Sequence, residues 1–177
     1  MVSYTRILPR YALGVSCPII EKDYNIMMSE RRLYQVSLFL ALLGLAVSGY
    51  LTYVKLADAP MICLEGVFQC DAIQQSAYAE LMGIPVAVLG LLSYGVIFAL
   101  LVLQKQNAFL EENGIGLLMG LVFFAWLYSM YLVYIQAFVL EAWCQWCVVH
   151  EVIITLLLIV TGFRFKRYLS DDDFEEA

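Results

Sequence analysis

Four long apolar stretches divide the chain, and each can cross a membrane as one helix. They cover residues 33–56, 84–103, 115–140 and 143–163. A helix needs about 20 apolar residues to span roughly 30 Å of hydrocarbon, because it rises about 1.5 Å per residue. The centres of the first three stretches carry no charge, whereas His150 and Glu151 lie near the start of the fourth. We therefore expect an all-α integral membrane protein that folds as a four-helix bundle.

The composition supports a membrane location and excludes one class of partner. Of the 177 residues, 63% are hydrophobic and 15% are charged, compared with about 45–50% and about 25% in soluble domains. The net charge is −6, and residues 171–176 are almost all acidic. We expect this acidic end to be solvated and disordered. No basic patch suited to nucleic acid is present, so we expect membrane lipid but no nucleic acid as a partner.

The positions of lysine and arginine predict the orientation of the bundle, because these residues accumulate in cytoplasmic loops. If both termini are cytoplasmic, every basic residue except Lys55 falls on that side, and the opposite loops 57–83 and 141–143 contain none. We therefore expect a cytoplasmic segment 1–32, a membrane domain 33–163 and an acidic cytoplasmic tail 164–177. Cys17 would then be an ordinary reduced thiol in the cytoplasm.

The 57–83 loop is predicted to form a lid over the outer end of the bundle. Pro60 ends the first helix, because proline lacks a backbone N–H and has a fixed φ. A short half-helix is expected from Asp71 to Met82, with Gly83 ending it. Long structured loops often have a function. The lid either encloses a substrate or is a connector that covers the helix ends.

The chemistry of the chain is predicted to lie in four cysteines on the outer face: Cys63, Cys70, Cys144 and Cys147. Disulfides form and persist on that side of a membrane. Cys144 and Cys147 share a helix face, and the helix N-terminus favours a thiolate there. A redox relay is the interpretation we favour, because this pair meets both water and lipid. Two alternatives are a four-thiolate zinc site, although we expect no metal, and two structural disulfides.

Other polar and aromatic residues lie close to this pair. Ionisable groups inside a membrane are costly and usually face the bundle interior, so His150 and Glu151 either relay a proton or reach interfacial water. Trp146 either belongs to an interfacial aromatic belt or contacts a flat ligand. Ser76 either lies near the relay or bonds its own backbone. The small residues Gly44, Ser48 and Thr52 recur every four positions and predict close helix packing.

Together these residues resemble the vitamin K epoxide reductase family over about residues 33–163. The resemblance rests on Cys63 and Cys70, on the Ser76 that follows them, on the segment Gly-Ile-Pro-Val-Ala-Val-Leu-Gly at 83–90, and on Trp-Cys-Gln-Trp-Cys at 143–147. It implies a prokaryotic-type, single-domain homologue in the plasma membrane, with a quinone held beside Cys147. Ser76 matches a family hydroxyl near the relay.

The resemblance also implies an electron path. A thioredoxin-like thiol-disulfide protein outside the membrane would reduce Cys63 and Cys70, Cys70 would exchange with Cys144, and Cys147 would face the quinone. Many relatives carry a fused thioredoxin-like domain, and this chain stops at Ala177, so the partner is expected to be a separate protein. The activity would be that of a quinone-dependent thiol-disulfide oxidoreductase that supports disulfide formation.

The chain departs from the family members that act on vitamin K. Those members hold the quinone with an asparagine in the second span and a tyrosine in the fourth, where this chain has Val86 and the pair His150 and Glu151. With Trp146, these are the quinone-binding candidates, and ubiquinone or menaquinone is the expected acceptor. A vitamin K quinone or epoxide reductase of the endoplasmic reticulum and a non-catalytic membrane scaffold are the alternatives. The related disulfide-bond-forming protein B type places its C-x-x-C pair in the first outer loop instead.

Overall fold

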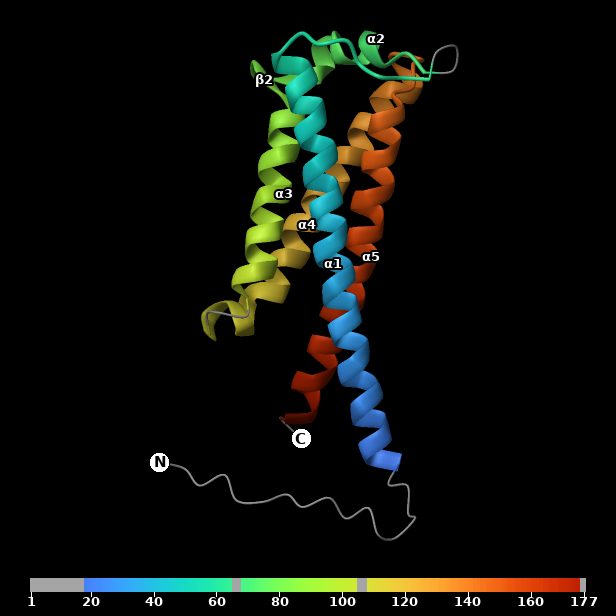
Figure 1. Ribbon diagram of the computed structural model, residues 1–177. Helices are drawn as coiled ribbons and strands as arrows, with labels where there is room; N and C mark the ends of the chain where they lie inside the picture. Colours follow the sequence, from blue (N-terminus) through green and yellow to red (C-terminus); the bar gives the residue numbers. More distant parts are fainter. Residues whose placement is uncertain (1–17, 65–67, 105–107, 176–177) are drawn as a thin grey trace.

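The protein is a bundle of four long helices with a small cap over one end (Figure 1). The computed structural model describes residues 18–64, 68–104 and 108–175. In chain order the elements are α1 (Pro18–Leu56), α2 (Cys70–Gln74), the 3-10 helix η1 (Ala77–Ala79), β1 (Glu80–Leu81), β2 (Ile84–Pro85), α3 (Val86–Leu103), α4 (Ala108–Phe138) and α5 (Gln145–Glu175).

Each long helix contains a segment long and apolar enough to cross a membrane. These segments are Glu30–Leu56, Val86–Leu103, Asn113–Phe138 and Gln145–Ser170. Large apolar side chains such as Phe39 and Phe124 are exposed on the outside of the bundle, as expected for helices that are hydrophobic on all sides and lie in lipid. The prediction of an all-α integral membrane protein with four spans is confirmed.

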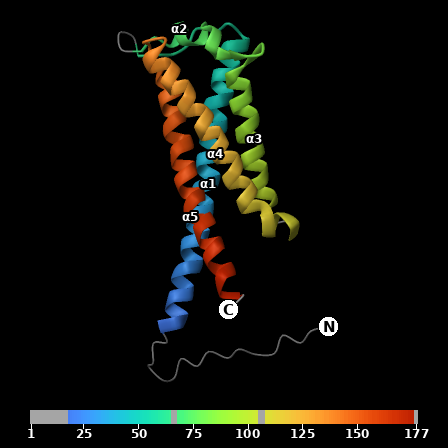
Figure 2. The ribbon, with the colours of Figure 1, turned by 180° about the vertical axis from the view of Figure 1, so that it is seen from behind.

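The long helices form a closed ring in which neighbours run in opposite directions. The helix α1 packs against α3 and α5, and α4 packs against α3 and α5, an arrangement visible from both sides (Figures 1 and 2). The buried core lies between them and is made mainly of Leu40, Ala41, Tyr94, Ile97, Leu101, Leu118, Val122, Ile154 and Leu157. This ring positions the cap at one end and the beginning of α1 and the end of α5 at the other.

Small residues bring α1 and α3 into close contact, as the sequence predicts. The ring of Tyr94 lies against Gly44 so closely that a Cβ on Gly44 would overlap it. One turn away the relation is reversed, since a Cβ on Gly90 would lie 3.4 Å from the Ser48 hydroxyl. The expected role of the small-residue stripe in helix packing is confirmed.

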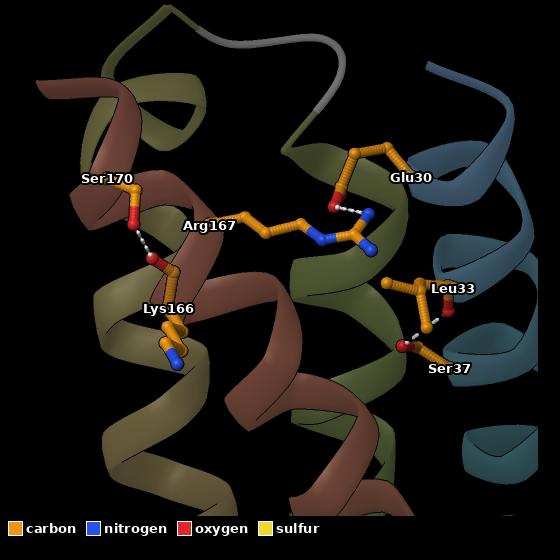
Figure 3. A network of polar contacts seen from close by, with 6 residues as sticks. All are labelled: Glu30, Leu33, Ser37, Lys166, Arg167 and Ser170. Carbon is orange, nitrogen blue, oxygen red and sulfur yellow. Dashed lines mark hydrogen bonds and ion pairs between the residues drawn. The ribbon is translucent and has the colours of Figure 1, made fainter. Parts of the chain in front are cut away.

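The end of the bundle opposite the cap departs from the prediction, because both helices run past the expected span limits. The helix α1 begins at Pro18 and α5 continues through Glu175, so the prediction of a disordered acidic end was wrong. Arginine, lysine and glutamate are good helix formers, and Arg167 forms an ion pair with Glu30 of α1 at 3.0 Å (Figure 3). Cys17 lies outside the described residues.

The cap, residues 57–64 and 68–85, also differs from the predicted half-helix. The helix α2 ends at Gln74, because the Ser76 hydroxyl donates to the Ile73 carbonyl at 2.7 Å and Ser76 itself is extended. Such local side-chain bonds compete with a helix. The chain then forms η1 and the antiparallel β1–β2 hairpin, whose turn residues Met82 and Gly83 both have positive φ, as a type I′ turn requires.

A lysine at the end of α1 fixes the cap to the bundle. Lys55 donates to the Gln74 carbonyl at 2.8 Å and forms an ion pair with Glu80 at 3.1 Å. The cap therefore lies across one end of the helix bundle (Figure 1).

Candidate functional site

The four predicted cysteines lie together where the cap meets the start of α5, Cys63 and Cys70 in the cap and Cys144 and Cys147 at the start of the helix. Cys63 and Cys70 form a disulfide, with their Cα atoms 6.6 Å apart, while Cys144 and Cys147 are free thiols. All four belong to one apolar cluster, the cysteine cluster, whose buried members are Cys70, Ile73, Ala142 and Cys144 and whose partly buried members are Met61, Cys63, Phe68, Leu140, Trp146 and Cys147. With two of the four thiols in a disulfide, this arrangement does not offer the four thiolates of a zinc site.

Backbone bonds bring the two pairs together from distant parts of the chain. The N–H of Gln69, directly before Cys70, donates to the carbonyl of Trp143, directly before Cys144, at 2.9 Å. Both Cys70 and Cys144 are almost fully buried. Cys70 and Cys144 therefore lie in the same dry environment.

The start of α5 is built around the sulfur of Cys144. This residue precedes the first helical residue, its carbonyl accepts from Val148 at 3.1 Å, and its sulfur accepts the N–H of Cys147 at 3.4 Å. The sulfur thus occupies the position of an N-cap acceptor. A hydrogen bond from the Cys147 side chain, with N–H groups of Cys147 and Trp146, lowers the pKa of Cys144 to about 7 although burial opposes this. The helix terminus favours a thiolate, as the sequence predicts.

Two aromatic side chains form a clamp on the segment that carries Cys63. The indole N–H of Trp146 donates to the Ile62 carbonyl at 2.8 Å, and its ring lies 4.7 Å from that of Tyr50 in α1. The Tyr50 hydroxyl accepts from the Ile62 N–H at 3.1 Å. Trp146 is absent from the described cavity lining and lies instead against the segment that carries Cys63.

A cavity of about 440 Å³ lies in the bundle below the cap, a volume typical of sites for small organic ligands. Its wall combines side chains of α1, α2, η1, α3, α4 and α5 and is mainly apolar. Four of the predicted site residues line it: Ser76, Val86, Cys147 and His150. Cys147 therefore belongs both to the cysteine cluster and to the cavity wall.

Two residues of the cavity wall, Tyr94 and Ser48, have buried hydroxyl groups. Tyr94 is 2% exposed, its ring meets that of His150 edge-on at 5.5 Å, and its hydroxyl has no hydrogen-bond partner among the described residues. The Ser48 hydroxyl is likewise buried without a partner in that part of the chain. An unpaired buried polar group is costly, so both hydroxyls would gain from a hydrogen-bond partner.

Glu151 lies beside the cavity rather than in its wall. Its carboxylate accepts from the hydroxyl of Ser129, which lines the cavity, and from that of Thr155 at 3.1 Å. Thr155 in turn accepts from the Trp126 indole at 3.1 Å. Ser129 thus connects the carboxylate to the cavity.

Two further residues at the site, Gln136 and Tyr94, could not be identified from the sequence. Gln136 is 6% exposed, lines the cavity, and accepts the N–H of Cys144 with its side-chain oxygen at 3.4 Å. Both residues lie inside apolar helices, where one amide or one tyrosine among many does not stand out. Their contacts in the structure identify them, since Gln136 bonds Cys144 and the Tyr94 ring meets His150.

Comparison with known proteins places this geometry in a family. Residues 35–162 match the profile of the vitamin K epoxide reductase family. The chain belongs to this family. It is also similar to a thiol-disulfide oxidoreductase, LTO1, of Arabidopsis thaliana, with 38% identity over 53 residues. That match covers 30% of this chain and 14% of the relative, so the chain spans only a small part of the relative's length. The resemblance seen in the cysteine motifs is confirmed.

Proposed function

We propose that the protein is a membrane thiol oxidase that passes electrons from a thioredoxin-like dithiol protein to a membrane quinone. The observation that carries this proposal is the position of Cys147 between the cysteine cluster and the cavity. Its partner Cys144 lies in the cluster with Cys70, on the side of the cap disulfide. Family membership and the similarity to a thiol-disulfide oxidoreductase support a thiol-disulfide reaction.

The thiol steps balance in electrons without any further reagent. A thiolate of the partner attacks Cys63, the Cys63–Cys70 bond breaks, and Cys70 leaves as a thiolate. Cys70 then attacks Cys144 of an oxidised Cys144–Cys147 pair, and Cys147 leaves as a thiolate. Completion of both exchanges leaves an oxidised partner and a Cys144–Cys147 dithiol. The direction is set by the reduction potentials of the pairs.

A quinone fits the residues of the cavity. The wall is largely apolar, as a flat lipid-soluble ring requires, and the Tyr94 and Ser48 hydroxyls have no hydrogen-bond partner within residues 18–64, 68–104 and 108–175. A bound quinone would accept two electrons and two protons from the dithiol. His150 lies on the cavity wall, and Ser129 connects Glu151 to it, so both are placed to hold or move a proton. Val86, rather than a polar side chain, favours ubiquinone or menaquinone over an epoxide.

The charge distribution supports the proposed setting in the membrane. Lys55, the basic residue at the cap end, is engaged with Glu80, while Arg164, Lys166 and Arg167 lie near the opposite end of α5. Basic residues favour the cytoplasmic side. We therefore place the cap and the cysteine cluster outside a prokaryotic plasma membrane, with the thiol partner on that side.

The test is anaerobic quinone reduction by the purified protein with a dithiol donor. Wild type and Cys17→Ser should turn over with ubiquinone or menaquinone, while Cys147→Ser should show no turnover at an unchanged melting temperature. Cys17→Ser is the matched control because it removes a cysteine distant in sequence from the two pairs. Turnover retained in a folded Cys147→Ser protein would exclude Cys147 as the quinone-facing cysteine.

A further inference from the structure

The side chain of Gln136, near the end of α4, contacts both cysteines of the C-x-x-C pair. Its oxygen accepts the backbone N–H of Cys144 at 3.4 Å, and its side chain also hydrogen-bonds the side chain of Cys147. Gln136 is 6% exposed and lines the cavity. Among the described residues that line the cavity, no other side-chain amide hydrogen-bonds either cysteine.

The turn between α4 and α5 fixes Gln136 in this position. After α4 the carbonyl of Ile135 accepts from both Val139 and Leu140, and the carbonyl of Gln136 accepts from Ala142 at 3.1 Å. Glu141 adopts a positive φ of 47°, which folds the chain back over the end of α4. Cys144 therefore returns onto the residue that preceded the turn.

The orientation of the amide decides what it offers to Cys147. A glutamine side chain has one oxygen acceptor and one NH₂ group with two donors. Because the oxygen is occupied by the Cys144 N–H, the NH₂ group is the part that is free to meet the Cys147 sulfur. We propose that Gln136 is a hydrogen-bond donor to the Cys147 thiolate and so makes Cys147 the leaving sulfur on the cavity side.

This inference rests on the proposed thiol relay and assigns a residue to one of its steps. When Cys70 attacks Cys144, a Cys70–Cys144 bond forms, the Cys144–Cys147 bond breaks, and the electron pair goes to the Cys147 sulfur. An anion is costly in an apolar site, and a bond from a donor to an ionised acceptor is stronger than a neutral one. The Gln136 amide therefore stabilises charge at the position where the step creates it.

The test measures how Cys147 ionises, with neither quinone nor partner present. In a Cys144→Ser background, the rate of Cys147 alkylation by iodoacetamide is followed against pH by mass spectrometry. Other titratable groups on the surrounding elements stay unchanged in every variant: Tyr78 of η1, Tyr94 of α3, Tyr128 of α4, and His150 and Glu151 of α5.

Gln136→Met keeps nearly the same length but has no N–H donor. We expect it to raise the pH midpoint of alkylation by roughly one to two units, the effect of losing one hydrogen bond to a charged group. Gln145→Met is the matched control, because the Gln145 amide oxygen accepts the Leu64 N–H at 3.3 Å and the side chain forms no hydrogen bond with Cys147 in the described part of the chain. This control should keep the midpoint of the parent.

Gln136→Glu separates the donor role from a purely structural one. At the alkaline pH where a buried thiol ionises, a carboxylate accepts the backbone N–H of position 144 but has no donor for Cys147. The proposal predicts a midpoint at least as high as that of Gln136→Met. A parental midpoint in either folded variant would overturn it. Loss of quinone reduction in wild type would instead count against the proposed function and leave this result unaffected.

Discussion

Replacing Gly44 with alanine tests how the packing of α1 against α3 maintains the cavity. A methyl group on Gly44 would overlap three atoms of the Tyr94 ring. The ring is rigid and fully buried between the helices, so either the ring or the α1 backbone must move. Overpacking of this kind costs about 1–3 kcal/mol.

The expected magnitude must be separated from the intrinsic effect of alanine, which favours a helix over glycine by roughly 1 kcal/mol. Gly95→Ala provides this control, because Gly95 follows Tyr94 in α3 and a Cβ there meets nothing within 4 Å. The difference in unfolding free energy between Gly44→Ala and Gly95→Ala should therefore be about 1–3 kcal/mol, with Gly44→Ala less stable.

The assay is reversible unfolding in mixed micelles, followed by quinone kinetics. Tyr94 lines the cavity and contacts His150, so we expect Gly44→Ala to raise the KM for quinone while Gly95→Ala leaves it unchanged. Adding Tyr94→Leu to Gly44→Ala should cost less stability than Tyr94→Leu does in wild type, because the smaller side chain leaves room for the methyl. Equal stability of the two alanine variants would refute the packing argument.

Three further predictions concern the site. The pKa of Cys144 is lowered from 9.0 to about 7 by the Cys147 hydrogen bond, so its alkylation should be half-maximal near pH 7, and the stability of the dithiol form should rise from about pH 7 to 9; a midpoint near 9 would contradict this. Glu151→Gln keeps an acceptor for Ser129 but cannot ionise, so slower quinone reduction at unchanged stability is expected, and an unchanged rate at every pH would remove Glu151 from proton transfer. Trp146→Phe loses the bond to Ile62, which should cost about 0.5–1.5 kcal/mol and speed proteolysis of the cap; unaltered proteolysis would show that the clamp is dispensable.

Much of the fold could be predicted, because in a membrane protein each long apolar segment marks a helix that crosses the bilayer. The segment Val86–Leu103 begins within two residues of the predicted start at Ile84. The limits at the other end of the bundle were missed for a physical reason. Outside the hydrocarbon, charged residues can either continue a helix or form a loop, so the sequence does not show where the helix stops. Here the Glu30–Arg167 pair joins α1 to α5 through residues 137 positions apart.

The cap was harder to predict because its conformation depends on single local bonds. The apolar spacing of residues 71–82 fits a helix, yet one hydroxyl, that of Ser76, ends α2 by bonding to Ile73. The sequence identified Gly83 as a terminator of helix. It did not indicate that Met82 would share the positive φ of a two-residue hairpin turn.

The candidate site shows the same division between motif and packing. Cysteine spacing identified the four cysteines of the cluster, since thiol chemistry requires few residue types. The cavity, by contrast, is formed by helices that contribute one or two side chains each, and Gln136 and Tyr94 become notable only through what they contact. Trp146 shows the opposite case. It lies next to Cys147 in the sequence, but its ring packs against Tyr50 and it is absent from the described cavity wall.

The separate roles that we propose for Cys144 and Cys147 rest on their positions on one helical turn. Cys144 caps α5, is fully buried, and faces the cap disulfide through the cysteine cluster, so thiol exchange can reach it without opening the cavity. Cys147 lies one turn further into the bundle and lines the cavity, so a lipid-soluble acceptor can reach it without meeting the thiol partner. A three-residue spacing is short enough for the two sulfurs to share one disulfide. It is also long enough for Cys147 to line the cavity while Cys144 stays in the cysteine cluster. The same spacing in a water-exposed loop would leave both sulfurs open to the same reagents.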